Sequence, residues 1–132
     1  MLGIEENPAQ RECVLLVDGM GMNALELCAK ELPVFSHMTH MTMLNATFPS
    51  TTSTSLTSFG TGLDVGVHGM VGYTMRVPHS GTPERLLNAL KWDERVDPYI
   101  WQSQKTLFER AVNEGVKVSH IAAKRYEETG FT

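Results

Sequence analysis

A run of five consecutive apolar residues, CVLLV at positions 13–17, is the feature that most restricts the fold. Its length suits a strand, and an uninterrupted apolar strand is typical of a parallel sheet covered on both faces. Further strand signals at residues 43–47 and 116–122, with helix signals between them, indicate alternating strands and helices. We therefore expect an α/β fold with a partial doubly wound, mostly parallel sheet and flanking helices.

Capping signals place two helices. Asn23, with Glu26 three residues later, is typical of a helix start, and Pro33 is expected to end that helix. Thr106 and Glu109 form a capping box, which predicts a second helix that ends at residue 115, a glycine. These two helices would flank the expected sheet.

Shorter elements are expected in the rest of the chain. Residues 34–41, rich in Met and His, could form a short helix, and residues 73–77 are predicted to form a strand. Residues 78–83 contain two prolines and a glycine, which favour a turn. Residues 84–103 have little periodicity, so only short or irregular elements are expected there.

Composition indicates one globular unit. The chain has 132 residues, of which 42% are hydrophobic and 20% charged, so it is long enough to bury a core. Residues 1–12 are polar and are expected to be a loose lead-in, and residues 13–132 are expected to form the domain. Three strands are few for a doubly wound sheet, and residues 127–132 do not resemble the end of a folded domain. We therefore expect the chain to be the N-terminal portion of a longer protein.

Charge and hydropathy exclude several classes of partner. The net charge is −4 and basic residues form no cluster, which argues against nucleic-acid polymers and anionic membranes. No apolar run approaches the length of a membrane span, and the N-terminus lacks the pattern of a secretory signal. A cytoplasmic location is therefore expected. The cysteines, Cys13 and Cys28, lie in apolar segments and are predicted to be small buried hydrophobes rather than a disulfide.

A hydroxyl-rich run is the most unusual stretch of the chain. Most of residues 50–59 are Ser or Thr, yet Leu56, Phe59 and Leu63 recur at helical spacing. This pattern predicts a short helix that buries the apolar stripe and ends at Gly62. A hydroxyl at a helix N-terminus lies where N–H groups and the dipole favour an anion, which suits a nucleophile that attacks phosphate. The alternative is a polar helix face or an exposed turn.

Asp18 directly follows the first apolar run, at the end of a strand where open α/β sheets bind ligands. A carboxylate near a nucleophile suits a divalent cation, whereas the plainer alternative is an Asp that caps a turn or helix. Gly19, Gly21 and Ala24 also match a dinucleotide-binding fingerprint. Against this alternative, Asp18 would lie beside the pyrophosphate, and residues 32–63 contain no acid to bind the ribose.

The histidines give weaker signals. His37 and His40 are three residues apart and can share a helix face, but two ligands without a partner acid make a weak metal site. His68, His79 and His120 are isolated, which is more typical of surface or hydrogen-bonded core residues than of ligands.

Several motifs, in this order, resemble the alkaline phosphatase superfamily. They are VDG at 17–19, FPSTTS at 48–53, TGL at 61–63 and HG at 68–69. The nucleotide pyrophosphatase/phosphodiesterase branch is most similar, since it carries VDG, FPTxTFPNH, TGL and SHG in that order and spacing. Each motif alone is weakly specific, but the ordered set is specific. The resemblance covers residues 13–73.

The resemblance implies an alkaline-phosphatase-like fold and two zinc ions. Asp18 matches a zinc ligand, and Thr52 matches the threonine nucleophile, which also contacts metal. The family's other Asp and His ligands would lie in later sequence, so this chain by itself is expected to be inactive. Two departures concern the substrate: residues 53–56 replace the FPNH of the family, and Tyr73 stands where many members have a phosphate-binding Asn.

The predicted function is metal-dependent hydrolysis of phosphodiester or nucleotide pyrophosphate bonds in a small-molecule substrate. Thr52 would attack phosphorus, and water would then hydrolyse the phosphothreonine, with zinc assisting both steps. A phosphomonoesterase or phosphonate hydrolase of the same superfamily is the first alternative. A non-catalytic nucleotide-binding module is the second. The sequence indicates neither the leaving group nor the oligomeric state.

Overall fold

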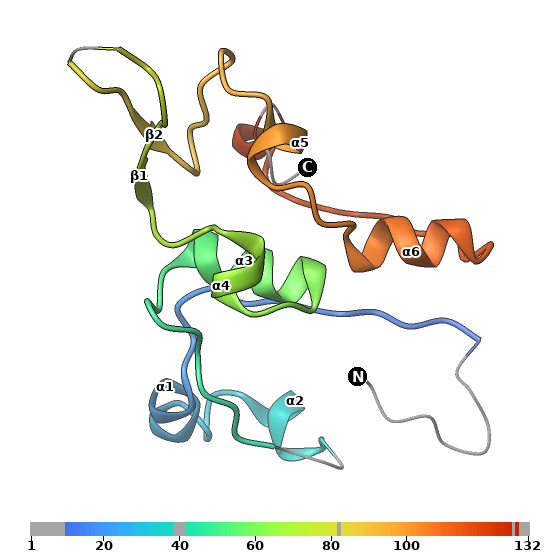
Figure 1. The fold of residues 1–132 in the computed structure, drawn as a ribbon. Helices are drawn as coiled ribbons and strands as arrows, with labels where there is room; N and C mark the ends of the chain where they lie inside the picture. The colour runs from blue at the N-terminus through green and yellow to red at the C-terminus, as the bar shows by residue number, and fades with distance from the viewer. Residues whose placement is uncertain (1–9, 39–41, 82, 128, 130–132) are drawn as a thin grey trace. The chain divides into compact units, whose positions relative to one another are not determined.

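A computed structural model describes residues 10–38, 42–81, 83–127 and 129 of the chain (Figure 1). Chain contacts divide the protein into two compact units, residues 1–43 and residues 44–132. The first unit contains two short helices, α1 (Met22–Leu27) and α2 (Pro33–Ser36). The second contains α3 (Thr52–Thr61), α4 (Val65–His68), β1 (Thr74–Arg76), β2 (Leu86–Asn88), α5 (Pro98–Trp101), α6 (Leu107–Asn113) and the 3-10 helix η1 (Lys124–Tyr126).

The helices of the first unit start and end at other residues than the sequence signals predicted. The N-cap of α1 is Gly21, without a side-chain capping bond, so the helix start predicted at Asn23 is misplaced. Pro33 was expected to end this helix, but α1 ends at Leu27 and Pro33 instead begins α2 at its first position. A proline suits that position, because its missing N–H would have no partner in the helix. Of the short helix predicted over residues 34–41, positions 39–41 lie outside the described residues.

A β-hairpin organises the core of the second unit. β1 and β2 pair antiparallel, with Met75 opposite Leu87, which confirms the strand predicted within residues 73–77. Two further backbone bonds extend the pairing, from Val77 N to Arg85 O and from Ala89 N to Tyr73 O, each 2.9 Å. The buried hydrophobic cluster consists of Met70, Met75, Val77, Leu87, Ala89 and Val96, with Trp92 and Trp101 packed against it.

The expected parallel sheet is not found among the described residues. Their one sheet is the two-stranded antiparallel hairpin, and the runs at 13–17, 43–47 and 116–122 form no strand. Leu15, in the centre of the first run, is 80% exposed. A parallel strand needs hydrogen-bonded neighbours and helices on both faces, and the described residues supply neither to these runs. The described residues therefore form an α/β structure, as predicted, but they do not form the predicted doubly wound parallel sheet.

Helix α6 forms as its sequence signals predict. Thr106 Oγ1 accepts from Glu109 N at 3.1 Å, and Glu109 Oε2 accepts from Thr106 N at 2.7 Å, which completes the capping box. Gly115 follows the helix with φ of 83° and donates its N–H to Val112 O at 2.9 Å. This positive φ explains why a glycine ends the helix.

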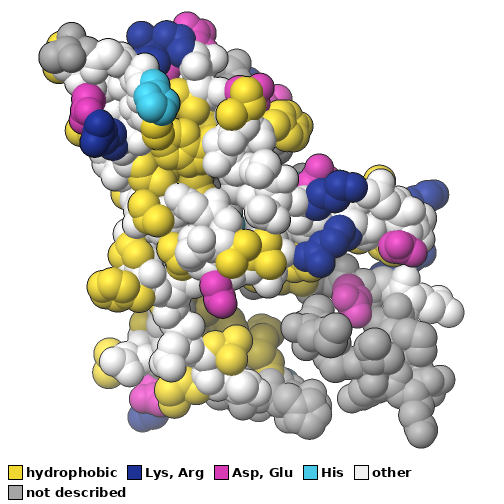
Figure 2. Space-filling model, in the orientation of Figure 1, with side chains coloured by type: hydrophobic (Ala, Val, Ile, Leu, Met, Phe, Trp, Pro, Cys, Tyr) yellow, Lys and Arg dark blue, Asp and Glu magenta, His cyan; other side chains and the backbone are white. Residues whose placement is uncertain are grey.

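Several apolar side chains are exposed, and Figure 2 shows hydrophobic side chains on the surface. Cys13 and Cys28 are exposed free thiols, so the prediction that they are buried was wrong. The run that contains Cys13 has no covering layer among the described residues, and α1 ends just before Cys28 without burying a residue. In the described part of the chain, no helix has the length and apolar character needed to cross a bilayer.

Candidate active site at the start of helix α3

The hydroxyl run folds into α3, a ten-residue helix whose first turn is capped by Thr51. Thr51 has extended backbone angles, and its Oγ1 accepts from Thr54 N at 3.4 Å and lies 2.9 Å from Thr54 Oγ1. Its carbonyl accepts from Ser55 N at 2.9 Å. A β-region threonine with this pattern is the favoured kind of N-cap, so the helix predicted from the hydroxyl run is confirmed, with a hydroxyl residue at its start.

Thr52, the predicted nucleophile, is the first residue of α3 and is half-buried. It therefore lies at the helix end where backbone N–H groups and the dipole favour an anion. Asp18, the predicted metal ligand, belongs to the other unit, where it is exposed in a turn just before Gly19. The two units are described separately, so the proximity of Asp18 to Thr52 stays a prediction.

The buried face of α3 carries hydroxyl groups rather than the predicted apolar stripe. The buried residues of the helix are Ser53, Thr54, Thr57 and Thr61, whereas Phe59 is 44% exposed. Thr57 Oγ1 donates to Ser53 O at 2.8 Å, and Thr61 Oγ1 donates to Thr57 O at 2.7 Å. Because each hydroxyl binds a carbonyl one turn earlier, these threonines can be buried without an unsatisfied donor.

Ser53 and Ser58 of α3 bind segments that come later in the chain. Ser53 Oγ donates to Gly72 O at 2.8 Å, just before β1, and Ser58 Oγ lies 2.8 Å from His68 Nε2 at the end of α4. Figure 1 shows α3 and α4 side by side, and their residues are in contact. No sequence pattern indicated these contacts, because each joins residues that are ten or more positions apart.

His68 is a buried, hydrogen-bonded core residue, which is one of the two roles expected for an isolated histidine. Its side chain is 2% exposed, and Nδ1 accepts from Met70 N at 3.1 Å. Since Nδ1 is an acceptor, the neutral ring carries its proton on Nε2 and donates it to Ser58 Oγ. Burial lowers the pKa of His68, and the nearby Asp64 carboxylate opposes this effect only in part. In this tautomer the ring cannot act as a general base toward Ser58, so the pair joins two helices.

The C-terminal end of α3 is joined to α6. Gly62 ends α3 in the left-handed region with φ of 71°, which confirms the predicted helix end. A Cβ added at Gly62 would lie 3.6 Å from both Leu107 and Arg110. Arg110 Nη2 also donates to Thr61 O at 2.7 Å, so a helix C-terminal carbonyl has a cationic partner. Helix α3 is therefore held at both ends by other elements of its unit.

The described residues do not by themselves make a metal site. No group of three or more His, Cys, Asp or Glu side chains gathers among them. His37 Nδ1 lies 2.7 Å from Pro33 O, one helical turn earlier, and His40 lies outside the described residues. A zinc site normally needs about three or four protein ligands, so the described side chains alone do not fit one.

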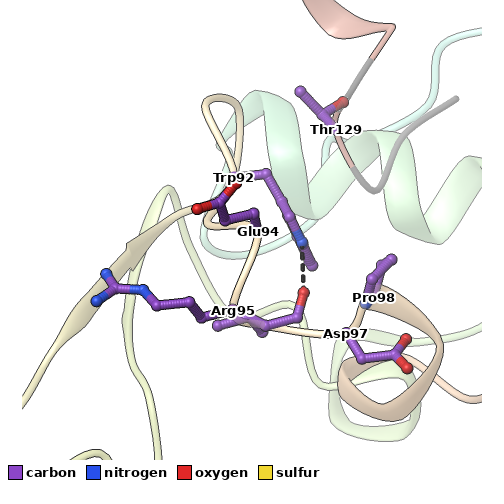
Figure 3. Close-up of a pocket in the computed structure, with 7 residues that line it drawn as sticks. Trp92, Glu94, Arg95, Asp97, Pro98 and Thr129 are labelled. Carbon is purple, nitrogen blue, oxygen red and sulfur yellow. Dashed lines mark hydrogen bonds between the residues drawn. The ribbon is translucent and has the colours of Figure 1, made fainter.

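A hollow among the described residues lies elsewhere in the second unit. Its volume is about 450 Å³, and Figure 3 shows it beside Trp92, whose Nε1 donates to Val96 O at 2.8 Å. The other lining residues are Glu94, Arg95, Asp97, Pro98 and Thr129. No residue of α3 lines this hollow, and the Arg95 side chain already binds Asp93, mainly through hydrogen bonds that lower the Asp93 pKa to about 2. We do not assign the chemistry to it.

The hydroxyl-rich start of α3 lies where backbone N–H groups favour an anion such as phosphate. Comparison with family models gives the class of protein: the model of type I phosphodiesterase / nucleotide pyrophosphatase matches residues 13–128, and the chain belongs to this family. No curated protein and no solved structure matched the chain. The resemblance drawn from the sequence motifs is thus confirmed. The family indicates phosphodiesterase or nucleotide pyrophosphatase activity on small-molecule substrates.

Proposed function

We propose that this chain supplies the nucleophile for hydrolysis of a phosphodiester or nucleotide pyrophosphate bond, and that Thr52 is this nucleophile. The observation that carries the proposal is the position of Thr52 as the first residue of a capped, ten-residue helix. Thr51 takes the capping role, so the two adjacent hydroxyls differ in function. The family match over residues 13–128 supports the same reaction class.

In the proposed reaction, Thr52 Oγ1 attacks phosphorus in line with the leaving oxygen. The Oγ1–P bond forms, the bond from phosphorus to the leaving oxygen breaks with its electron pair on that oxygen, and the hydroxyl proton passes to solvent. Water then cleaves the phosphothreonine and restores Thr52. The N–H groups of the first turn of α3 face the region where phosphate oxygens gain charge, and fixed dipoles of this kind stabilise such charge.

The two zinc ions implied by the family resemblance stay a proposal. Asp18 and Thr52 are this chain's candidates to hold them, and the described residues gather no larger set. We therefore derive no step through zinc from this structure. A threonine hydroxyl is a weak nucleophile without an activating group, so the proposal requires such a group at Thr52. The expected cytoplasmic location likewise stays a prediction.

Substitution of Thr52 tests the proposal. In the natural full-length protein, Thr52→Ala should lower the turnover of bis(4-nitrophenyl) phosphate by about a thousandfold or more, because the attacking oxygen is lost. Thr52→Ser keeps that oxygen and should retain most of the activity. The fold should be nearly unchanged in both variants, as measured by circular dichroism and thermal unfolding.

Neighbouring hydroxyls provide the controls. Thr51→Ala and Thr54→Ala should reduce turnover far less than Thr52→Ala, although Thr51→Ala removes the N-cap and should lower stability by about 1 kcal/mol. If Thr51→Ala is inactive and Thr52→Ala is active, the nucleophile is Thr51 and not Thr52. A panel of monoesters, phosphonates and dinucleotides then separates the alternatives, and nucleotide binding without turnover of any substrate would favour a binding module.

A further inference from the structure

Ser53, the residue after the proposed nucleophile, is buried and makes a hydrogen bond to a distant segment. Its side chain is 0% exposed, and its Oγ donates to Gly72 O at 2.8 Å. The two residues are 19 positions apart in the chain. The bond therefore fixes the first turn of α3, which contains Thr52, against the backbone that leads into β1.

The segment that receives this bond is itself anchored. The carbonyl of Tyr73 accepts from Ala89 N at 2.9 Å, and β1 begins at the next residue. Ala89 and the paired residues Met75 and Leu87 belong to the buried cluster of the hairpin. Ser53 thus connects the start of α3 to the backbone that leads into the hairpin, whose residues belong to the buried hydrophobic cluster.

The other buried hydroxyls of α3 do not provide such a connection. Thr54 Oγ1 lies 2.9 Å from Oγ1 of the N-cap Thr51. Thr57 Oγ1 and Thr61 Oγ1 each donate to a carbonyl of α3 itself, one turn earlier. Ser53 is therefore distinct, because its hydroxyl fixes the position of the helix start relative to another segment, whereas theirs compensate for their own burial.

We propose that Ser53 is a positioning residue, whose bond to Gly72 holds the Thr52 hydroxyl in line with the scissile phosphorus. This inference rests on the proposed function, because it takes Thr52 as the nucleophile. Ser53 itself touches no reacting atom. A displacement of about 1 Å in a reacting group can cost about a hundredfold in rate, so loss of a bond one residue away is expected to have a measurable effect.

The test compares two helix variants in the natural full-length protein. Ser53→Ala removes the bond to Gly72 and also a 3.3 Å contact of Ser53 Oγ with Thr51 Oγ1. Its kcat on bis(4-nitrophenyl) phosphate should fall about 10- to 100-fold with little change in KM. Thr51→Ala also lacks the contact with Thr51 Oγ1 but keeps the bond to Gly72, so it controls for that contact. Thr57→Ala is the matched control, because it removes a buried hydroxyl bond in the same helix without affecting Gly72. Its melting temperature should fall, but its kcat should stay near that of the unmutated protein. Both are assayed well below their melting temperatures.

A second variant covers the case in which Ser53→Ala does not fold. Ser53→Cys is similar in size and keeps a weak S–H donor, so its kcat should fall between those of Ser53→Ala and the unmutated protein. The inference is overturned if a folded Ser53→Ala or Ser53→Cys variant turns over at the unmutated rate. It is also overturned if Thr57→Ala loses as much kcat as Ser53→Ala.

Thr52→Ala, assayed in parallel, separates this inference from the function on which it rests. If Thr52→Ala is inactive and Ser53→Ala is normal, only the positioning role fails. If Thr52→Ala keeps its turnover, Thr52 is not the nucleophile, and the role proposed for Ser53 in positioning it is also wrong.

Discussion

At the scale of single residues, the Ser and Thr side chains of α3 have separate roles. Thr51 caps the helix, Thr57 and Thr61 bind carbonyls of their own helix, and Ser53 binds a distant carbonyl. Thr52, the first residue of the helix, is the proposed nucleophile. Hydroxyls with structural roles of this kind are compatible with one reactive hydroxyl in the same run, so the interpretation as a polar helix face and the proposed nucleophile do not exclude each other.

His68 predicts a dependence of stability on pH. Burial lowers its pKa in the folded protein below the value of about 6.5 for an unfolded histidine. Below about pH 6.5 the unfolded chain binds more protons at this residue than the folded protein does, so the free energy of unfolding should fall as the pH is lowered. Above about pH 6.5 the residue is neutral in both states and should not change the free energy of unfolding further. Urea unfolding at pH 7.5 and at pH 5.5 measures the difference.

The control for His68 is the exposed His79. His68→Gln should reduce the pH dependence of the free energy of unfolding. His79→Asn removes an exposed imidazole at a position where Asn tolerates the positive φ of 57°, and it shows how much the loss of any histidine changes this pH dependence. Equal pH dependence in the His68→Gln variant and the unmutated protein would show that this ring does not titrate between the two states.

Two alternative roles remain for Asp18: it is either a metal ligand or a structural residue of the turn. The N-cap of α1 is Gly21, so Asp18 is not the cap of that helix. Asp18→Asn keeps the shape but removes the charge, and a neutral amide is a poorer ligand for a divalent cation. We expect zinc content and turnover of the full-length protein to fall together, as measured by atomic absorption and by phosphodiester hydrolysis.

Glu12→Gln is the comparison for Asp18→Asn, because it neutralises another exposed acid just before the same apolar run. It should change neither zinc content nor rate. If Asp18→Asn also leaves both unchanged, the carboxylate acts only in the turn, because Asn serves in turns and caps about as well as Asp.

At the scale of elements, the capping box of α6 gives a sharp stability prediction. Thr106→Ala removes the bond from Glu109 N, and should lower the free energy of unfolding by about 1 kcal/mol. Thr106→Ser keeps the hydroxyl and should cost much less. Chemical denaturation of the two variants checks this, and equal stability of Thr106→Ala and Thr106→Ser would contradict the capping role.

The capping box also carries part of the acid sensitivity of the protein. The backbone N–H of Thr106, with its side chain, lowers the pKa of Glu109. The stabilising effect of this carboxylate is therefore present above its ordinary pKa of 4.5 and is lost as the pH falls through the lowered value. The contribution is small, because the bonds are exposed to solvent.

Apart from β1, which depends on its pairing with β2, the elements that the sequence predicted correctly have local determinants. The starts of α3 and α6 depend on residues within one turn, and the ends at Gly62 and Gly115 depend on single residues with positive φ. The runs at 13–17 and 116–122 have apolar composition but no local determinant of pairing, since a parallel strand requires partners from distant parts of the chain. Their composition alone therefore could not establish a sheet.

At the scale of the whole molecule, the family and the site were predictable to different extents. Four short motifs in a fixed order were enough to indicate the family that matches residues 13–128. The contacts of Ser53 with Gly72 and of Ser58 with His68 were not predictable, because they depend on how α3 packs against segments later in the chain. The order of the motifs therefore indicates the family, whereas tertiary packing determines the role of each hydroxyl of α3.

The 132-residue chain by itself is predicted to be catalytically silent. Asp18 and Thr52 are its only proposed metal ligands, whereas a zinc site normally needs about three or four, and the described residues gather no such group. Exposed apolar side chains such as Leu15 also lack covering layers among the described residues, so this chain should bind a hydrophobic dye more strongly than a well-packed domain does. The purified chain, supplied with zinc, should hydrolyse bis(4-nitrophenyl) phosphate no faster than its Thr52→Ala variant. Turnover above that control would show that the chain assembles a working site without further ligands.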